Sequence, residues 1–275
     1  MKKKKVSKTE SVKPSCIPQI AIGAGIFFVI QILFISFNFF GLEKTFFGNI
    51  FITIISFLAF LSMLCLYKRF PHNFPMERKA KLFLLISTSL FFLGDLLWLF
   101  EEAVLKNIMP LGQFPDLFWT LGYVALMTSI QFFIKMEFRE SKKLLNLLIV
   151  LSIIVGGLFL YFDIAYSLNE GVLTFGGLIQ DLYPVYDIAV FAMIFYLLWP
   201  LIITKNTYFI GWFWLGLGVL TRLIYDIVFI IMNKNHTYYT GHPIDLVYEL
   251  LYIFIILNSW HKSQVLSKFS AEDTK

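Results

Sequence analysis

Charged residues make up only 15% of this 275-residue chain. Hydrophobic residues account for 58% and aromatic residues for 19%, and the mean hydropathy is +0.75. This balance excludes a water-soluble globular domain, because such domains carry about 25% charged residues. The composition predicts an all-α polytopic membrane protein.

Cysteine and histidine are also scarce. The two cysteines, Cys16 and Cys65, lie at the ends of apolar segments that we place on the cytoplasmic side. Thiols stay reduced there, so we expect no disulfide. The four histidines do not cluster at metal-ligand spacing, and familiar catalytic signatures are missing. We therefore expect no metal, no other cofactor, and a binding protein rather than an enzyme.

Apolar runs dominate the sequence instead. A helix that rises 1.5 Å per residue needs about 20 apolar residues to cross the hydrocarbon core of a bilayer. Eight runs meet this requirement, at about residues 17–40, 45–67, 82–104, 114–134, 144–166, 179–203, 207–232 and 240–260. The first is too long for a signal peptide and lacks a cleavage site, so it is expected to remain as a helix.

The basic residues are distributed unevenly between the connections. Nineteen of the 23 lysines and arginines fall in the two tails and alternate loops. The remaining loops hold only Lys44, Lys106 and Lys234, while Arg222 lies within a span. The positive-inside rule then places both termini in the cytoplasm of a cell-membrane protein. The net charge of +5 is explained by this topology, and no nucleic-acid partner is expected.

The predicted organisation is a single membrane domain with short tails. Residues 1–13 form a basic cytoplasmic tail, 14–260 the eight-helix domain, and 261–275 a second cytoplasmic tail. The last tail is too short to bury a core. Any output must occur in the membrane or pass to a separate cytoplasmic signalling protein.

The membrane domain shows signs of an internal duplication. Spans starting near Asp116 and Asp245 both read D-L-x-[WY]-x-L-x-Y, and Asp95 and Asp226 occupy similar places in the preceding spans. Two four-helix repeats, about 14–134 and 144–260, explain this pattern. An even number of spans makes the repeats parallel, related by an axis along the membrane normal. Chance similarity between two aromatic-rich helix starts is the alternative.

Ionisable residues concentrate in the extracytoplasmic halves of the spans. Such groups are costly in a bilayer and usually face a bundle interior or a wet cavity. Residues three, four and seven apart share a helix face. The acids and aromatic residues of several spans share helix faces at this spacing. If these faces converge, they form an acidic, aromatic-lined cup, open to the extracytoplasmic side, that binds a small ligand or cation. Its candidate ligand-binding residues are Asp95, Trp98, Asp116, Trp119, Tyr123, Tyr183, Asp187, Arg222, Tyr225, Asp226, Asp245, Tyr248 and Glu249.

Simpler explanations exist for part of this pattern. Asp116 and Asp245 lie near helix starts, where an acid complements the helix dipole. The pair Tyr238 and Tyr239 is most simply an interfacial anchor. Asp95 and the other deep acids lie beyond the reach of capping, so they indicate a ligand site or a buried polar network.

Three segments resemble a known membrane module. Residues 115–123 (PDLFWTLGY), 182–187 (LYPVYD) and 243–248 (PIDLVY) are similar to the repeated P-x-D-x-x-Y-x-x-x-Y, Y-P-x-x-D and D-x-x-W/Y patterns of a multi-helix sensory module. That module occurs at the amino end of bacterial and archaeal signalling proteins, fused to PAS, histidine-kinase or GGDEF domains. The resemblance covers spans 3 to 8 and implies a sensory role, although this chain lacks an output domain.

A weaker resemblance points to an enzyme. Gly94-Asp95 and Asp226 match positions of the lysoplasmalogenase family, whose members are eight-helix hydrolases of vinyl-ether lipids. This resemblance implies catalytic roles for Asp95 and Asp226 as an acid and base pair. Our first hypothesis is a membrane receptor or sensor, and the alternative is this hydrolase. Transport is less favoured, because the cytoplasmic halves of the spans lack polar groups that would continue a pathway.

Overall fold

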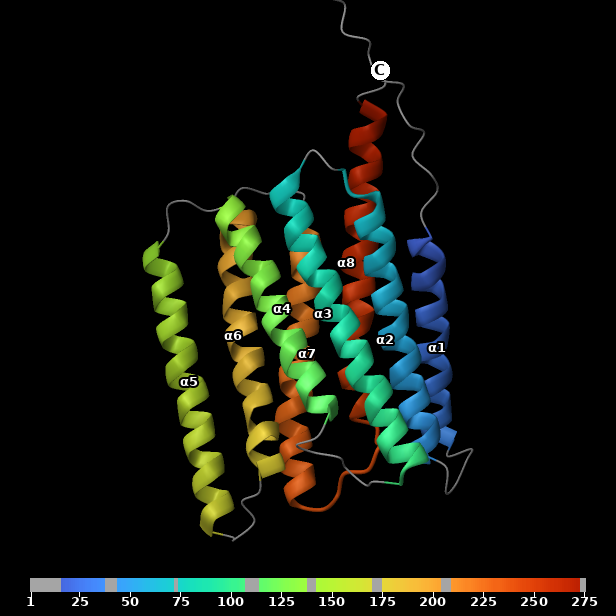
Figure 1. Cartoon of the computed structure of the whole chain (residues 1–275), viewed down its shortest axis with the longest axis vertical. Coiled ribbons are helices and arrows are strands. Elements are labelled where there is room, and N and C mark those ends of the chain that lie inside the picture. The colour runs from blue at the N-terminus through green and yellow to red at the C-terminus, as the bar shows by residue number, and fades with distance from the viewer. Residues whose placement is uncertain are drawn as a thin grey trace, which may run out of the picture.

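The computed structural model describes residues 16–37, 44–71, 74–106, 114–137, 142–169, 175–203 and 209–272. Within these ranges it contains eight long α-helices and no strand (Figure 1). They are α1 (Ile17–Phe37), α2 (Lys44–Arg69), α3 (Pro75–Leu99), α4 (Phe114–Glu137), α5 (Lys142–Asn169), α6 (Phe175–Ile203), α7 (Phe209–Lys234) and α8 (Asp245–Glu272). A short π-helix, η2 (Phe100–Val104), continues α3.

The predicted all-α membrane fold is confirmed. Seven of the described helices, α1 to α7, are long and apolar enough to cross a membrane. The exception is α8, which carries Asp245, Glu249 and Lys262. These three side chains are buried, because α8 packs against α1, α2 and α7. Neighbouring helices therefore cover the polar groups of α8.

Successive helices run in opposite directions, so α1 begins and α8 ends at the same end of the bundle (Figure 1). We call this the terminal end. The opposite end carries the connection from α7 to α8, residues 235–244, and we call it the distal end. Tight packing of α3 on α4 and of α7 on α8 forms the centre of the bundle. Helix α5 packs along α6 at one edge of the bundle, and its Asp163 also pairs with Lys234 of α7.

Helix neighbours in the first half have counterparts in the second. The pairs α1–α2, α2–α3 and α3–α4 correspond to α5–α6, α6–α7 and α7–α8, and α2–α8 corresponds to α6–α4. The contact between α1 and α8 has no such counterpart among the described residues. Superposition of the two halves stays a prediction.

Two predicted helix starts are wrong. Helix α3 begins at Pro75 rather than near residue 82, because proline is favoured in the first helical turn. Lys81, which we expected in a loop, is therefore buried within α3, with Nζ 3.4 Å from Glu77 Oε1. Helix α8 begins at Asp245 rather than at 240, because residues 237–244 form turns whose backbone is bonded locally.

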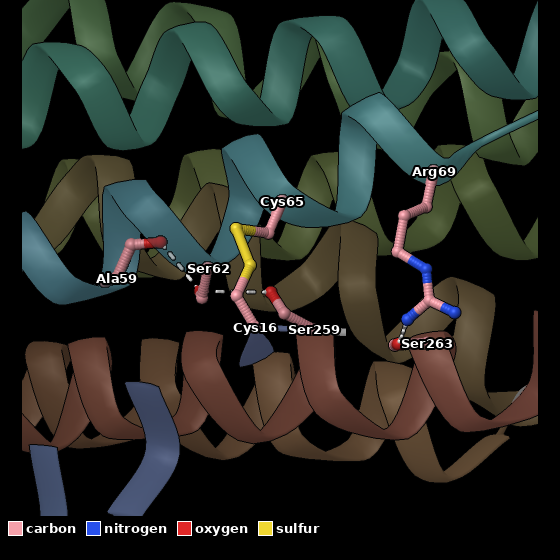
Figure 2. Close-up of a disulfide and its surroundings, with 7 residues drawn as sticks. All are labelled: Cys16, Ala59, Ser62, Cys65, Arg69, Ser259 and Ser263. Atoms are coloured by element: carbon pink, nitrogen blue, oxygen red, sulfur yellow. Dashed lines mark hydrogen bonds between the residues drawn. A yellow bond between two sulfur atoms is a disulfide. The ribbon is translucent and has the colours of Figure 1, made fainter. Parts of the chain in front are cut away.

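The prediction that no disulfide forms is also wrong. Figure 2 shows Cys16, just before α1, bonded to Cys65 in the last turns of α2. The two Cα atoms are 6.7 Å apart. Antiparallel packing of α1 on α2 brings the start of one beside the end of the other, and this proximity is not visible in the sequence. Nearby, Arg69 Nη1 donates to Ser263 Oγ at 2.6 Å and ties α2 to α8.

Candidate functional site

A cavity lies toward the distal end of the bundle. The centre of a water molecule can occupy about 50 Å³ inside it. One water needs roughly 10–15 Å³ by this measure, so the space admits a few waters or one small ligand. The cavity is lined by Asn49, Ile52, Asp95, Trp98, Trp119, Tyr183, Arg222, Tyr225, Asp226, Phe229, Tyr238, Thr240 and Tyr248.

Helix α7 supplies the longest run of cavity residues. Arg222, Tyr225, Asp226 and Phe229 are three, four and seven residues apart, which places them on one helix face. All four are buried. Helix periodicity is thus sufficient to bring this part of the site together.

Close packing of α3 and α4 positions the opposite wall. A Cβ atom on Gly94 would lie 2.4 Å from Nε1 of Trp119, so only glycine allows the indole to approach there. Trp119 Nε1 donates to Asp95 Oδ1 at 3.0 Å. The indole rings of Trp98 and Trp119 lie 5.5 Å apart. Gly94 therefore fixes both an aromatic wall and a hydrogen bond to the adjacent acid.

Asp95 is the centre of a hydrogen-bond network between three helices. Besides the bond from Trp119, its carboxylate accepts hydrogen bonds from the hydroxyls of Tyr248 and Tyr252, each at 2.6 Å. Asp95 is only 3% exposed. Three donors occupy both carboxylate oxygens, which satisfies a buried charge that would otherwise be costly.

Arg222 is the one buried cation in the cavity lining. Its Nε lies 3.3 Å from Asp226 Oδ1, one helical turn along α7. Its guanidinium also lies over Tyr248, 4.2 Å from the ring centroid. The Nη1 nitrogen is buried and has no hydrogen-bond partner among the described residues. A buried donor without a partner is costly, so this nitrogen is a candidate contact for a ligand.

The aromatic side chains form a nearly continuous wall. The Tyr225 ring lies 4.9 Å from that of Tyr248 and 5.6 Å from that of Phe229. Phe229 in turn lies 4.5 Å from Tyr238. On the other side the Trp119 and Tyr183 rings are 6.1 Å apart. These rings come from α4, α6, α7, α8 and the α7–α8 connection.

The other predicted site residues form a second layer behind this wall. Asp116 accepts a hydrogen bond from the Tyr183 hydroxyl, and Asp187 accepts one from Tyr123 at 2.6 Å. Asp245 accepts from the Tyr238 hydroxyl at 3.0 Å. Glu249 lies farther out and accepts from Gln31 Nε2 of α1. Asp116, Tyr123, Asp187, Asp245 and Glu249 are therefore buried but do not line the cavity.

Glu102 connects the cavity rim across three elements. One oxygen of its carboxylate accepts from Trp98 Nε1 at 2.9 Å, from Asn49 Nδ2 at 2.7 Å and from Thr240 Oγ1 at 2.7 Å. These donors come from α3, α2 and the α7–α8 connection. Glu102 lies in the π-helix η2. It thus holds the connection against the helices that line the cavity.

The α7–α8 connection is part of the site, which the sequence interpretation missed. Tyr238, which we expected to be an interfacial anchor, is 7% exposed and lines the cavity. Its neighbour Tyr239 is 42% exposed. Gly241, at a φ of 93°, packs against the start of α2, where a Cβ on Gly48 would lie 2.8 Å from its Cα. This contact holds the connection over the cavity. It explains why Tyr238 is buried while Tyr239 is exposed.

Eight of the thirteen predicted residues thus line one cavity, namely Asp95, Trp98, Trp119, Tyr183, Arg222, Tyr225, Asp226 and Tyr248. The other five lining residues, Asn49, Ile52, Phe229, Tyr238 and Thr240, were not among the predicted ligand-binding residues. Asn49 is a polar residue within an apolar span, and this was the one signal that could have identified it. Ile52 and Thr240 carry no comparable signal.

The chain matches no protein-family model, and neither a curated protein nor a solved structure is significantly similar to it.

Proposed function

We propose that the chain is a membrane receptor that binds a small ligand in the distal cavity and signals to a separate cytoplasmic partner. The observation that carries this proposal is the cavity itself, with aromatic walls and a partnerless donor on Arg222. Apolar pockets with a few convergent polar groups are the usual form of small-molecule sites. The distribution of lysine and arginine supports a cell-membrane protein whose cavity faces the extracytoplasmic side.

The contacts around the cavity offer a route for the signal. Arg222 of α7 is bound within its own helix by Asp226 and lies over Tyr248 of α8. Tyr248 is bonded to Asp95 of α3. A ligand that draws the guanidinium away from Tyr248 would change the packing of α7 on α8. Helix α8 continues to the terminal end, where a cytoplasmic partner would detect the movement.

Ligand-dependent stabilisation tests the receptor proposal. The purified protein is unfolded thermally in nanodiscs against a panel of amino acids, amines, short carboxylates, sugars and metal cations. A ligand at 100 times its Kd stabilises the native state by about 2.7 kcal/mol, which gives a saturable rise in Tm. Arg222→Gln should abolish the rise.

Asp163→Asn is the matched control, because it also removes the charge of an acid paired with a cation on α7, but from the half-buried pair of Asp163 with Lys234, which lies away from the cavity. It should retain the rise in Tm. The proposal fails if no compound in the panel raises the Tm, or if Arg222→Gln and Asp163→Asn respond alike.

One observation favours the hydrolase alternative, since Asp95 and Asp226 line the same cavity. The three donors on Asp95 and the guanidinium beside Asp226 favour structural roles for both. Incubation with vinyl-ether lysolipids distinguishes the functions. Aldehyde release that is abolished by both Asp95→Asn and Asp226→Asn would establish the hydrolase in place of the receptor.

A further inference from the structure

The chemistry of the cavity lining identifies a class of ligand, if the receptor proposal holds. The first constraint is Arg222, which lines the cavity and whose buried Nη1 has no hydrogen-bond partner in the part of the chain that the structure describes. Arginine pairs most strongly with planar anionic acceptors such as carboxylates. The ligand should therefore carry a carboxylate, or a similar acceptor, at the α7 side of the cavity.

The second constraint is the charge of the lining as a whole. Two carboxylates, Asp95 and Asp226, face it together with the single guanidinium of Arg222. Three donors already occupy Asp95. Asp226 lies 3.3 and 3.4 Å from Arg222 Nε and is also hydrogen-bonded to the side chains of Tyr123 and Asp187 behind the wall. A ligand bearing only a negative charge would lie beside two acidic side chains, so the same ligand should also carry a cation.

The third constraint is the state of the aromatic rings. Tyr183, Tyr238 and Tyr248 line the cavity, and each donates its hydroxyl hydrogen to a carboxylate, on Asp116, Asp245 and Asp95 respectively. Donation of the hydroxyl hydrogen to a carboxyl oxygen makes a phenol ring richer in electrons. Electron-rich rings attract cations, and cages of this kind bind quaternary ammonium groups.

We infer that the cavity binds a small zwitterion that combines an ammonium group with a carboxylate. The carboxylate lies against Arg222 Nη1, and the ammonium group lies among the tyrosine and tryptophan rings, near the carboxylate of Asp226. The limited space restricts the ligand to a compact molecule in which a short linker joins the two charges. Arg222 thereby distinguishes zwitterions from simple amines, and the rings distinguish them from simple acids.

Three probes of nearly equal size separate these contributions. Glycine betaine carries both charges, 3,3-dimethylbutyrate has the same shape without the cation, and choline has the cation without the carboxylate. We expect glycine betaine to bind the full-length protein in nanodiscs at least tenfold more tightly than either of the others, as measured by isothermal titration calorimetry.

Two variants assign the binding determinants. Arg222→Gln should remove the preference for glycine betaine over choline. Phe229→Leu removes one ring of the wall without breaking a hydrogen bond, so it keeps the inference testable if Arg222→Gln fails to fold. It should weaken glycine betaine and choline severalfold and leave 3,3-dimethylbutyrate unchanged. Phe195→Leu on the exposed side of α6 is the matched control and should change none of the three affinities.

Each result has a distinct meaning. Equal binding of 3,3-dimethylbutyrate and glycine betaine would overturn the zwitterion in favour of a simple anion site. Equal binding of choline, unaffected by Arg222→Gln, would overturn it in favour of a cation site. If none of the three binds but another compound in the panel raises the Tm, the receptor proposal stands and this inference is wrong. If no compound binds at all, the receptor proposal itself fails.

Discussion

The two ends of the bundle bury different sets of charged residues, mainly acids beside Arg222 at the distal end and lysines at the terminal end. At the distal end, Asp95 and Asp187 are held by hydrogen bonds from tyrosine and tryptophan. At the terminal end, Lys81 and Lys262 lie over aromatic rings, both near Phe133, with Nζ atoms 5.5 and 4.9 Å from its centroid. Lys262 is also 4.2 Å from the centroid of Trp212.

This difference suggests different roles for the two ends. Hydrogen bonds to carboxylates are directional, so the distal network fixes side chains from several helices around a defined space. At the terminal end the aromatic rings are already covered by the ammonium groups of the chain's own lysines. Long lysine side chains also carry apolar stems that pack like hydrophobic residues. We propose on this basis that the distal end serves recognition and the terminal end serves packing.

The largest expected effect is the loss of the Asp95 network. Asp95→Asn replaces one acceptor oxygen by a donor, so at least one of the three groups that donate to Asp95 loses its present acceptor. We expect a loss of about 3 kcal/mol or more in the free energy of unfolding, because buried unsatisfied groups of this kind are costly. Reversible denaturation in mixed micelles measures it. A loss below about 1 kcal/mol would show that the distal network is not rigid.

The next effect is expected at the terminal end, from the disulfide. Cys16 and Cys65 are separated by 49 residues, and a disulfide closing such a loop contributes about 2–4 kcal/mol. Reduction should lower the Tm of the wild-type protein. Cys65→Ser should have the lower Tm already and should not respond to reductant. Equal responses of the two proteins would show that the bond does not contribute.

The smallest effect tests the terminal end directly. Lys81→Met keeps the length and apolar stem of the side chain but removes a buried ammonium group that pairs with Glu77. Replacement of a buried charge by a well-packed apolar group is often neutral or stabilising. We expect a change within about 1 kcal/mol of wild type by the same denaturation assay. A loss as large as that of Asp95→Asn would remove the contrast between the ends.

Sequence patterns predicted the elements better than the contacts between them. Apolar run lengths were sufficient for the eight helices, and helix spacing grouped Arg222 with Asp226 on one face. The sequence could not show which acids line the cavity. Asp116 lies behind it because it is bonded to Tyr183, which is 67 residues away, and such a pairing depends on helix packing.

Two other features were missed for related reasons. The disulfide depends on the packing of α1 against α2, whereas the sequence argument considered only the compartment. Moreover, the charge rule places this end of the bundle in the reducing cytoplasm, where disulfides are rare. Lys81 was counted as a loop residue because its charge obscured the true start of α3. A lysine can bury its long apolar stem within a helix, so a charged residue does not reliably mark where a helix begins.

The central claim is that the distal end is a ligand site reached from outside and the terminal end is not. Both native cysteines are in the disulfide, so one introduced cysteine is the only free thiol. Phe229→Cys in the cavity should react, in intact cells, with a methanethiosulfonate reagent that carries a trimethylammonium group, and glycine betaine should slow this reaction. Phe133→Cys, between Lys81 and Lys262, should not react. Equal labelling of the two positions, or labelling of Phe133→Cys alone, would contradict the account.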